Sequence, residues 1–225
     1  MSEKINQPDC SIVIPVYNEE KIVGEAITRL DAFLRDKDVR YEIIAVNDGS
    51  SDNSHEELKK LRLDSLRVIS HPHNRGYGAA LKTGVSESVA RKVLFYDADG
   101  QHKPDEVMRL IVESIDYDMV VGSRQGYQGP GWRQPGKKFI NLLANYLVSF
   151  KIPDLNSGLR IVSKKKFEQF EHLYPNGFSL STTITLAFIK HGFTVKYIPI
   201  TIEPRVGNSS VRITDGFKAI QLVLR

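Results

Sequence analysis

Two carboxylates and a carboxamide follow a short apolar run near the middle of the chain. Asp97, Asp99 and Gln101 come directly after residues 93–96, Val-Leu-Phe-Tyr. Such a run is typical of a buried strand, and the end of a strand would place the three side chains together at one edge of a sheet. Carboxylate and amide oxygens are hard ligands of the kind that hold a divalent ion against substrate phosphates. The spacing therefore predicts a metal site with a diphosphate ligand.

Further polar side chains follow two other apolar runs. Tyr17 and Glu19 come directly after residues 11–16, and Asp48 comes after residues 41–46. If these runs are parallel strands, the polar side chains meet at the carboxyl edge of the sheet, where open α/β sheets bind their ligands. A single acid at such a place often only caps a turn or a helix. Several acids on one edge favour a ligand site.

Apolar runs and helical patterns alternate along the chain. Within residues 20–34, for example, Ile22, Ala26 and Leu30 recur at the spacing of one helix face. The alternation predicts an α/β protein with a mainly parallel central sheet flanked by helices. The expected strands are residues 11–16, 41–46, 66–69, 92–96, 119–122 and 195–202, and the expected helices are residues 20–34, 56–61, 79–89, 104–115, 138–150 and 181–191.

The composition fits one compact domain. The chain has 225 residues, of which 41% are hydrophobic and 26% charged. It shows no apolar stretch of about 18 residues and no charged-then-apolar leader, so neither a membrane span nor secretion is expected. Cys10, the one cysteine, is expected to be a buried thiol in a reducing cytoplasm. A net charge of +4 without a basic patch interleaved with aromatics indicates no nucleic-acid partner.

The segments that carry these polar side chains resemble a known family. They look like the motifs of family 2 glycosyltransferases, which have the GT-A fold. Residues 156–160, Asn-Ser-Gly-Leu-Arg, are preceded by Asp154 and are similar to the polyprenyl-phosphate branch of that family, which includes dolichol-phosphate mannose synthases. The resemblance extends from about residue 10 to residue 212. The other segments that carry it are residues 14–20, 47–52, 74–78 and 97–102.

The resemblance implies an inverting transfer of a sugar from a nucleoside diphosphate sugar, GDP- or UDP-linked, to a polyprenyl phosphate. Asp97, Asp99 and Gln101 would bind Mg²⁺ or Mn²⁺ together with the donor phosphates, because a cation neutralises the charge that gathers on the leaving diphosphate. The reaction would take place at the cytoplasmic face of a membrane. Together with Asp97, the residues that would cradle the nucleotide are Pro15, Tyr17, Glu19 and Asp48.

Basic side chains in the second half of the chain suit a phosphate acceptor, since a guanidinium makes paired hydrogen bonds with phosphate oxygens. Arg124 and Arg205 match basic positions of the family. Arg133 and Lys137 lie in or just after residues 125–136, a segment rich in glycine and proline with the length of a functional loop. These four residues are the candidate acceptor-binding set. For Arg133, a solvated surface role is an equal alternative.

The role of Asp154 has three interpretations. Transfer to a sugar hydroxyl needs a carboxylate base, and Asp154 is then a candidate catalytic residue together with Asp97 and Asp99. A phosphate monoester is already a nucleophile at neutral pH, so with a lipid phosphate acceptor no base is needed. Asp154 would then orient Arg160 or the acceptor loop, or it would cap a loop.

The resemblance predicts a single catalytic domain over residues 1–225. Residues 10–123 would bind the nucleotide sugar and residues 124–212 the acceptor. Residues 213–225 have an amphipathic pattern. This tail either rests on a membrane surface or packs on the domain as an ordinary helix.

Other functions stay open or fail on particular residues. A family 2 enzyme with a saccharide acceptor, and a nucleotide-sugar sensor without activity, both remain alternatives. A dinucleotide-binding fingerprint fails because Leu81 stands where its third glycine is needed. A receiver-type signalling domain would need a lysine at Ser123-Arg124 and a much shorter chain.

Overall fold

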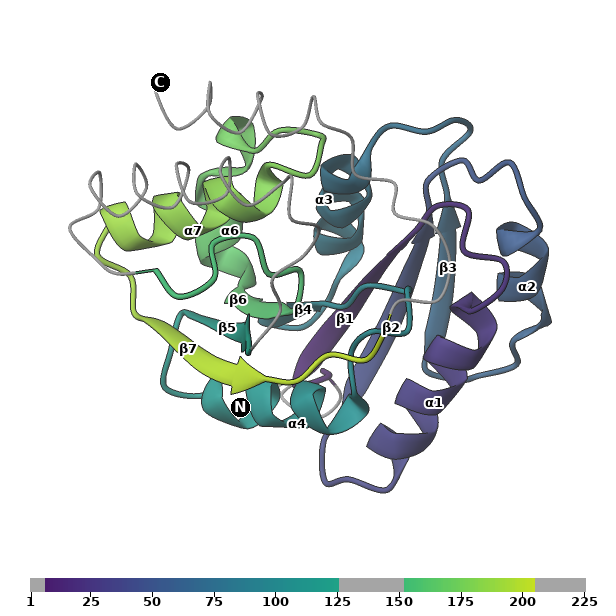
Figure 1. Ribbon diagram of the computed structural model, residues 1–225, viewed down its shortest axis with the longest axis horizontal. Coiled ribbons are helices and arrows are strands. Elements are labelled where there is room, and N and C mark those ends of the chain that lie inside the picture. The colour runs from purple at the N-terminus through teal and green to yellow at the C-terminus, as the bar shows by residue number, and fades with distance from the viewer. Residues whose placement is uncertain (1–6, 126–151, 205–225) are drawn as a thin grey trace, which may run out of the picture.

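The computed structural model describes residues 7–125 and 152–204 of the chain. Within these residues the strands are β1 (Cys10–Val16), β2 (Tyr41–Asn47), β3 (Leu66–Ser70), β4 (Lys92–Phe95), β5 (Met119–Arg124), β6 (Arg160–Ser163) and β7 (Val195–Ile200). The helices are α1 (Val23–Arg35), α2 (Ser54–Lys60), α3 (Tyr77–Glu87), α4 (Pro104–Glu113), α6 (Lys164–Gln169) and α7 (Leu180–Lys190), with a 3₁₀ turn η2 (Glu171–Leu173). Figure 1 shows their arrangement.

The strands form one mixed sheet in the order β3-β2-β1-β4-β6-β5-β7. The pairs β1/β2, β2/β3, β1/β4 and β5/β7 are parallel, whereas β6 is antiparallel to both of its neighbours. The prediction of a mainly parallel sheet is therefore confirmed. The antiparallel strand in its middle is absent from the sequence prediction.

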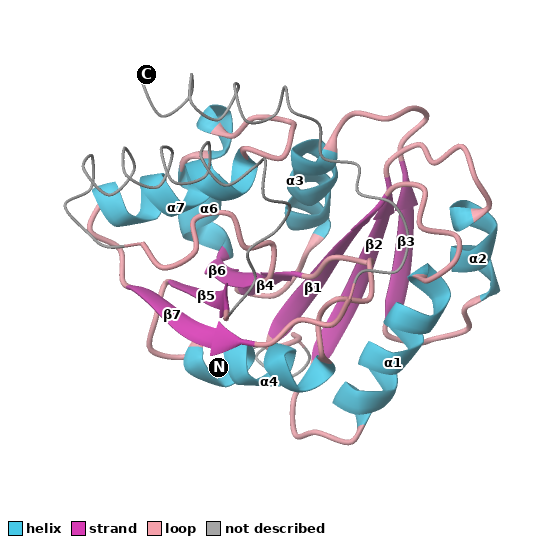
Figure 2. Ribbon diagram, in the orientation of Figure 1, coloured by secondary structure: helices cyan, strands magenta, loops and turns pink. Residues whose placement is uncertain are grey.

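Helices cover both faces of the sheet, as Figure 2 shows. Successive side chains of a strand point to opposite faces, and β1 is buried on both. Ile12 and Ile14 pack in one apolar cluster with residues of α1 and α4, and Val13 packs in a second cluster with residues of α3, α6 and α7. This double burial is why the strand reads as a continuous apolar run.

The three central parallel strands end toward the same edge of the sheet: β1 and β2 end level, and β4 ends three residues earlier. Val16 at the end of β1 pairs with Asn47 at the end of β2. Val13 pairs with Phe95 at the end of β4. The polar residues that follow these strands therefore begin at the same edge of the sheet, as predicted.

Several element boundaries differ from the sequence prediction. Helix α3 begins at Tyr77 rather than at residue 79, because Gly76 takes φ +102° and turns the chain directly into the helix. Helix α1 begins at Val23, after a turn that was predicted as helix. Strand β6, α6 and η2 were not predicted. The predicted loop 125–136, helix 138–150 and tail 213–225 lie outside the described residues, apart from residue 125.

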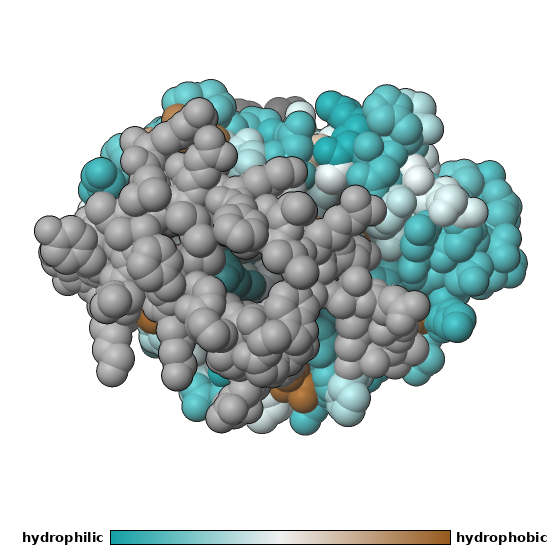
Figure 3. All heavy atoms as spheres, turned by 45° about the horizontal axis from the view of Figure 1, so that its top comes forward, coloured by the Kyte–Doolittle hydropathy of each residue, from teal (hydrophilic) through white to brown (hydrophobic). Residues whose placement is uncertain are grey.

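The buried cysteine and the polar surface agree with the expectation of one compact domain. Cys10 is fully buried, as expected, and burial raises the pKa of its thiol to about 12. In Figure 3 the described residues visible on the side of α2 and β3 are mostly hydrophilic. Among residues 7–125 and 152–204, no helix has both the length and the apolar character needed to cross a bilayer.

Candidate active site

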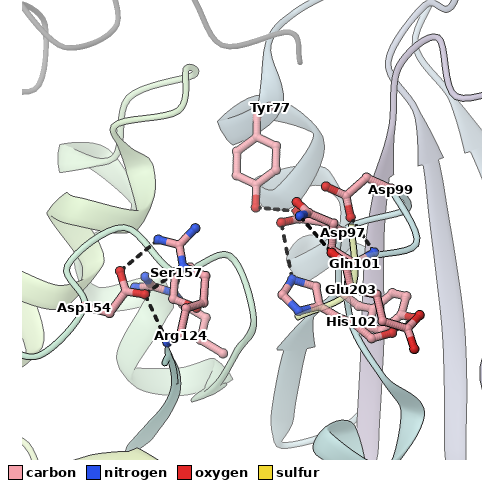
Figure 4. A network of polar contacts seen from close by, with 11 residues as sticks. Tyr77, Asp97, Asp99, Gln101, His102, Arg124, Asp154, Ser157 and Glu203 are labelled. Carbon is pink, nitrogen blue, oxygen red and sulfur yellow. Dashed lines mark hydrogen bonds and ion pairs between the residues drawn. The ribbon is translucent and has the colours of Figure 1, made fainter. Parts of the chain in front are cut away.

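The three predicted metal ligands lie on one loop that leaves the end of β4. Asp97 keeps 28% of its side chain exposed, whereas Asp99 is 6% exposed. Gly100 turns the loop at φ +75°, and the Asp99 carboxylate accepts a hydrogen bond from the backbone N–H of Gln101 at 3.0 Å. Figure 4 shows the three side chains together. The loop thus carries two carboxylates and a carboxamide within one turn of chain.

The chain near residue 203 holds the far end of this loop. The Gln101 side chain donates through Nε2 to the Glu203 carbonyl at 3.2 Å, and the Glu203 N–H donates to the Gln101 carbonyl at 2.9 Å. His102 and Ile202 form an antiparallel bridge next to these bonds. The loop is therefore fixed to the segment that leads on from β7.

The donor set fits a cation that also binds phosphate. Within the described residues, no three His, Cys, Asp or Glu side chains gather as a cation site made of protein alone. Mg²⁺ commonly takes one or two carboxylates and completes its shell with water and substrate phosphates. Asp97, Asp99 and the Gln101 amide are hard oxygen donors that suit this mode. They could hold Mg²⁺ or Mn²⁺ together with a diphosphate.

Backbone closely approaches the Asp97 carboxylate. A Cβ atom built on Gly158 would lie 2.2 Å from Asp97 Oδ2, so glycine at this position leaves room for the carboxylate where it lies. The same oxygen lies 3.8 Å from His102 Nε2. Gly158 belongs to the loop before β6, which brings the second half of the chain against the predicted metal ligand.

The loops after β1 and β2 are joined to each other by hydrogen bonds. Asn18 takes φ +55°, and its side chain accepts a hydrogen bond from the Ser51 N–H at 2.8 Å. The Glu19 N–H donates to Ser54 Oγ at 2.8 Å. Pro15, Tyr17 and Glu19 are partly exposed at this edge, which leaves surface that a ligand can contact.

Asp48 faces the protein interior and holds a turn. It is 2% exposed, and its carboxylate accepts hydrogen bonds from the N–H groups of Arg75 at 2.9 Å and Gly76 at 2.8 Å. His71 Nδ1 lies 2.7 Å from the same carboxylate, and His71 Nε2 lies 3.0 Å from Thr83 Oγ1. Asp48 therefore stabilises the turn at residues 75–76, a structural role that the sequence did not predict.

Asp154 forms a two-bond ion pair with Arg124. Arg124 Nε and Nη2 lie 2.7 Å and 2.9 Å from the two carboxylate oxygens, and the Arg124 N–H adds a longer bond at 3.3 Å. Burial alone would raise the pKa of Asp154, but the hydrogen bonds and charge of Arg124 outweigh burial and hold this pKa below its usual range. A carboxylate that is so reluctant to bind a proton is a poor general base.

Asp154 was expected to orient Arg160 or the acceptor loop, but its described ion pair is with Arg124, and the described hydrogen bonds of Arg160 go to other residues. Arg160 is fully buried and donates to the carbonyls of Ser157 and Ser181 and to the Thr185 hydroxyl. Burial lowers the pKa of Arg160 from its usual value. Arg160 thus ties the loop before β6 to α7.

Two residues beside Asp97 were not among the predicted site residues. The Tyr77 hydroxyl donates to Asp97 Oδ1 at 2.9 Å, and His102 lies near the other oxygen (Figure 4). Burial, and then the negative charge of Asp97, raise the pKa of Tyr77 well above its usual value. Tyr77 lies in the motif 74–78, and His102 follows Gln101 directly. Their place in these motifs is the sequence signal that could have marked them as site residues. The predicted acceptor-binding residues Arg133, Lys137 and Arg205 lie outside the described residues.

A family model named Glycosyl transferase family 2 matches residues 11–170. The chain belongs to this family. An uncharacterized protein of Methanocaldococcus jannaschii is 30% identical to this glycosyltransferase, and the alignment covers 96% of this chain and 91% of that protein. The undecaprenyl-phosphate 4-deoxy-4-formamido-L-arabinose transferase of Proteus mirabilis is 34% identical over 70% of this chain. The match spans 49% of that transferase, and 54% of its counterpart from Pseudomonas fluorescens.

Solved structures show the same fold. Glucosyl-3-phosphoglycerate synthase of Mycobacterium tuberculosis, in complex with UDP, superposes on this glycosyltransferase with a TM-score of 0.74 at 16% identity. The superposition covers 96% of this chain and 79% of that one. Mannosyl-3-phosphoglycerate synthase of Rubrobacter xylanophilus gives a TM-score of 0.71 at 18% identity, with 96% and 72% covered. The predicted GT-A fold is therefore confirmed.

Proposed function

We propose that this glycosyltransferase moves a sugar, with inversion, from a nucleoside diphosphate sugar to a polyprenyl phosphate. The proposal rests mainly on one observation, the loop with Asp97, Asp99 and Gln101 at the carboxyl edge of the sheet. The donor is GDP- or UDP-linked. The names of two bacterial relatives, both undecaprenyl-phosphate transferases, support the lipid phosphate acceptor.

The donor diphosphate binds at this loop together with Mg²⁺ or Mn²⁺. A cation there neutralises negative charge on the leaving diphosphate without any proton transfer. Related folds have been crystallised with Mn²⁺ and UDP-glucose and with Mg²⁺ and UDP, which supports the choice of ion. Asp97 and Asp99 supply the negative charge that keeps the cation in place. Their position at the end of β4 fixes them before any ligand arrives.

The nucleotide lies over the ends of β1 and β2. Pro15 and the Tyr17 ring supply apolar surface for the base, and the Glu19 carboxylate can accept hydrogen bonds from base N–H or ribose hydroxyl groups. Asp48 contributes by holding the turn at residues 75–76 rather than by presenting its oxygens outward. This makes the Asp48 contribution to nucleotide binding indirect.

The acceptor phosphate binds on the side of Arg124. A phosphate monoester attacks as an anion and needs no base. This suits Asp154, whose carboxylate is engaged by Arg124 and whose pKa is low. Arg133, Lys137 and Arg205, which lie outside the described residues, remain proposed phosphate-binding residues. Because the acceptor is a lipid, the enzyme acts at a membrane, and the family resemblance supports its cytoplasmic face.

The test is transfer of label into lipid. Enzyme, Mn²⁺, polyprenyl phosphate and a labelled GDP- or UDP-sugar are incubated, and the organic phase is counted. We expect chelator-sensitive transfer that Asp99→Ala reduces about 100-fold or more, as is usual when a charge-stabilising group is lost. Asp116→Ala, an exposed acid, serves as the control and retains activity.

Three outcomes contradict the proposal. Full activity of Asp99→Ala would remove the metal-loop assignment. Label that moves only into a water-soluble saccharide would establish the saccharide-acceptor alternative. Donor binding without turnover on any acceptor would favour a nucleotide-sugar sensor.

A further inference from the structure

Tyr77 reaches the predicted metal ligand from a different part of the chain. It is the first residue of α3, and its hydroxyl donates to Asp97 Oδ1 at 2.9 Å (Figure 4). A phenol keeps its proton far above neutral pH, so it can serve as a permanent hydrogen-bond donor to the carboxylate. The second oxygen, Oδ2, faces Gly158 and His102. Both oxygens of Asp97 therefore meet fixed neighbours.

The backbone at Tyr77 is rigidly placed. Gly76 takes φ +102°, a conformation that other residues rarely adopt, and its N–H donates to the buried Asp48 carboxylate at 2.8 Å. Asp48 in turn contacts His71 at 2.7 Å. The turn before Tyr77 is thus fixed by buried polar contacts and by glycine geometry.

The Tyr77 ring is held from the other half of the chain. It stacks on Phe178 with ring centroids 5.1 Å apart and planes 18° from parallel. The N–H groups of Gly78 and Ala79 donate to the Asn176 carbonyl at 2.7 Å and 3.2 Å. A Cβ atom on Gly78 would lie 2.3 Å from the Pro175 carbonyl oxygen, so the two backbones pack in direct contact. The segment before α7 therefore sets the direction of the phenol.

We infer that Tyr77 is a positioning residue that orients the Asp97 carboxylate for cation binding. A hydrogen bond to a ligating carboxylate fixes its rotation, and outer partners of this kind strongly affect metal affinity. Removing the hydroxyl frees Asp97 to turn away from the geometry it shares with Asp99 and Gln101. The inference rests on the proposed function, since it takes Asp97 as a metal ligand.

The experiment compares two Tyr→Phe substitutions. Tyr77→Phe keeps the ring and its stack on Phe178 but removes the hydroxyl. Tyr174→Phe is the control, because Tyr174 is a buried tyrosine whose hydroxyl has no hydrogen-bond partner within the described part of the chain. Mn²⁺ is titrated by calorimetry into each protein saturated with UDP and, in a second series, with GDP. Melting temperatures check that each variant is folded.

We expect Tyr77→Phe to raise the Mn²⁺ dissociation constant about 10-fold, the low end for a lost outer hydrogen bond to a metal ligand. Tyr174→Phe should leave it unchanged. Asp97→Ala distinguishes a failure of the metal assignment from a failure of the role inferred for Tyr77. Normal Mn²⁺ affinity in Asp97→Ala, or no Mn²⁺ binding by the unsubstituted protein in either series, would overturn the metal assignment and the inference with it. Weakened binding in Asp97→Ala with equal constants for the two Phe variants would overturn the inference alone.

Discussion

The Asp97 carboxylate, a proposed metal ligand, is contacted by residues from outside its own loop. The carboxylate supplies charge, but its surroundings include Tyr77 and Gly158, which come from two other segments, as well as His102 at the end of its own loop. A ligating carboxylate that is free to rotate loses part of its affinity, because orienting it on binding costs side-chain entropy. The neighbours of Asp97 are therefore sensitive positions for substitution.

Gly158→Ala should impair activity without unfolding the protein. The added methyl group would lie 2.2 Å from Asp97 Oδ2, and the carboxylate, at the far end of its side chain, would have to move away. We expect kcat/KM to fall about 10–100-fold, as for the loss of an outer contact to a metal ligand, with a nearly unchanged melting temperature.

The matched control for this substitution is Gly24→Ala in α1, where a Cβ atom would meet nothing within 4 Å. Equal kcat/KM in the two variants would show that the Asp97 carboxylate does not have to stay in its present place. A large drop in melting temperature only for Gly158→Ala would instead identify a structural role.

The candidate metal ligands could be predicted from the sequence because they lie close together in the chain, whereas the residues that contact them could not. Asp97, Asp99 and Gln101 are within five positions of one another, so a turn alone brings them together. Tyr77 and Gly158 are distant from them in the chain and arrive only by tertiary packing. Asp48 was readable as an acid at a strand end, but the direction of its side chain depends on the later turn at residues 75–76.

At the scale of elements, the strands that the sequence predicted most clearly are those buried on both faces of the sheet. The parallel strands β1 and β2 are buried on both faces and form long apolar runs. Strand β6 has four residues and begins with a buried arginine, Arg160, so it lacks such a run. Helix α6 has three lysines and a single buried apolar residue, Phe167, so no helical stripe marks it. Their formation depends on neighbours that are already in place.

The Arg124–Asp154 pair joins the end of β5 to the loop before β6, and its contribution to stability should depend on pH. The folded pKa of Asp154 lies below the ordinary value of about 3.9 for an unfolded chain. A lowered pKa stabilises the fold fully above the unfolded value, and this stabilisation is lost as pH falls through the folded pKa. Asp154→Asn should therefore cost about 2 kcal/mol of unfolding free energy at pH 7, the loss typical of a hydrogen bond to a charged group.

The measurement is urea unfolding of the unsubstituted protein and Asp154→Asn from pH 7 to pH 3. We expect the difference between them to shrink toward the acid end. Glu56→Gln, which removes one partner of the exposed pair with Lys59, is the control and should show no resolvable difference. A difference for Asp154→Asn that stays constant down to pH 3 would refute the ionised pair as its source.

At the scale of the whole molecule, the two described parts of the chain meet at the loop that carries Asp97, Asp99 and Gln101. Residues 7–125 supply the loop itself, while residues 152–204 supply Gly158 beside Asp97 and the Glu203 backbone beside Gln101. Arg29 of α1 also pairs with Glu203 at 3.1 Å, across the same junction. A ligand at this loop is therefore expected to stabilise the fold as a whole rather than one half.

Nucleotide and cation together should raise the melting temperature. A ligand at 100 times its dissociation constant stabilises the native state by about 2.7 kcal/mol. For a domain of roughly this size, each kcal/mol raises the melting temperature by about 2–4 °C, so a shift of about 5–10 °C is expected. Thermal unfolding is followed with UDP or GDP, each with Mn²⁺ or with a chelator, and the nucleotide giving the larger Mn²⁺-dependent shift identifies the donor base. An equal shift in chelator would show that the nucleotide binds without the cation, which would contradict a shared diphosphate and metal site at Asp97 and Asp99.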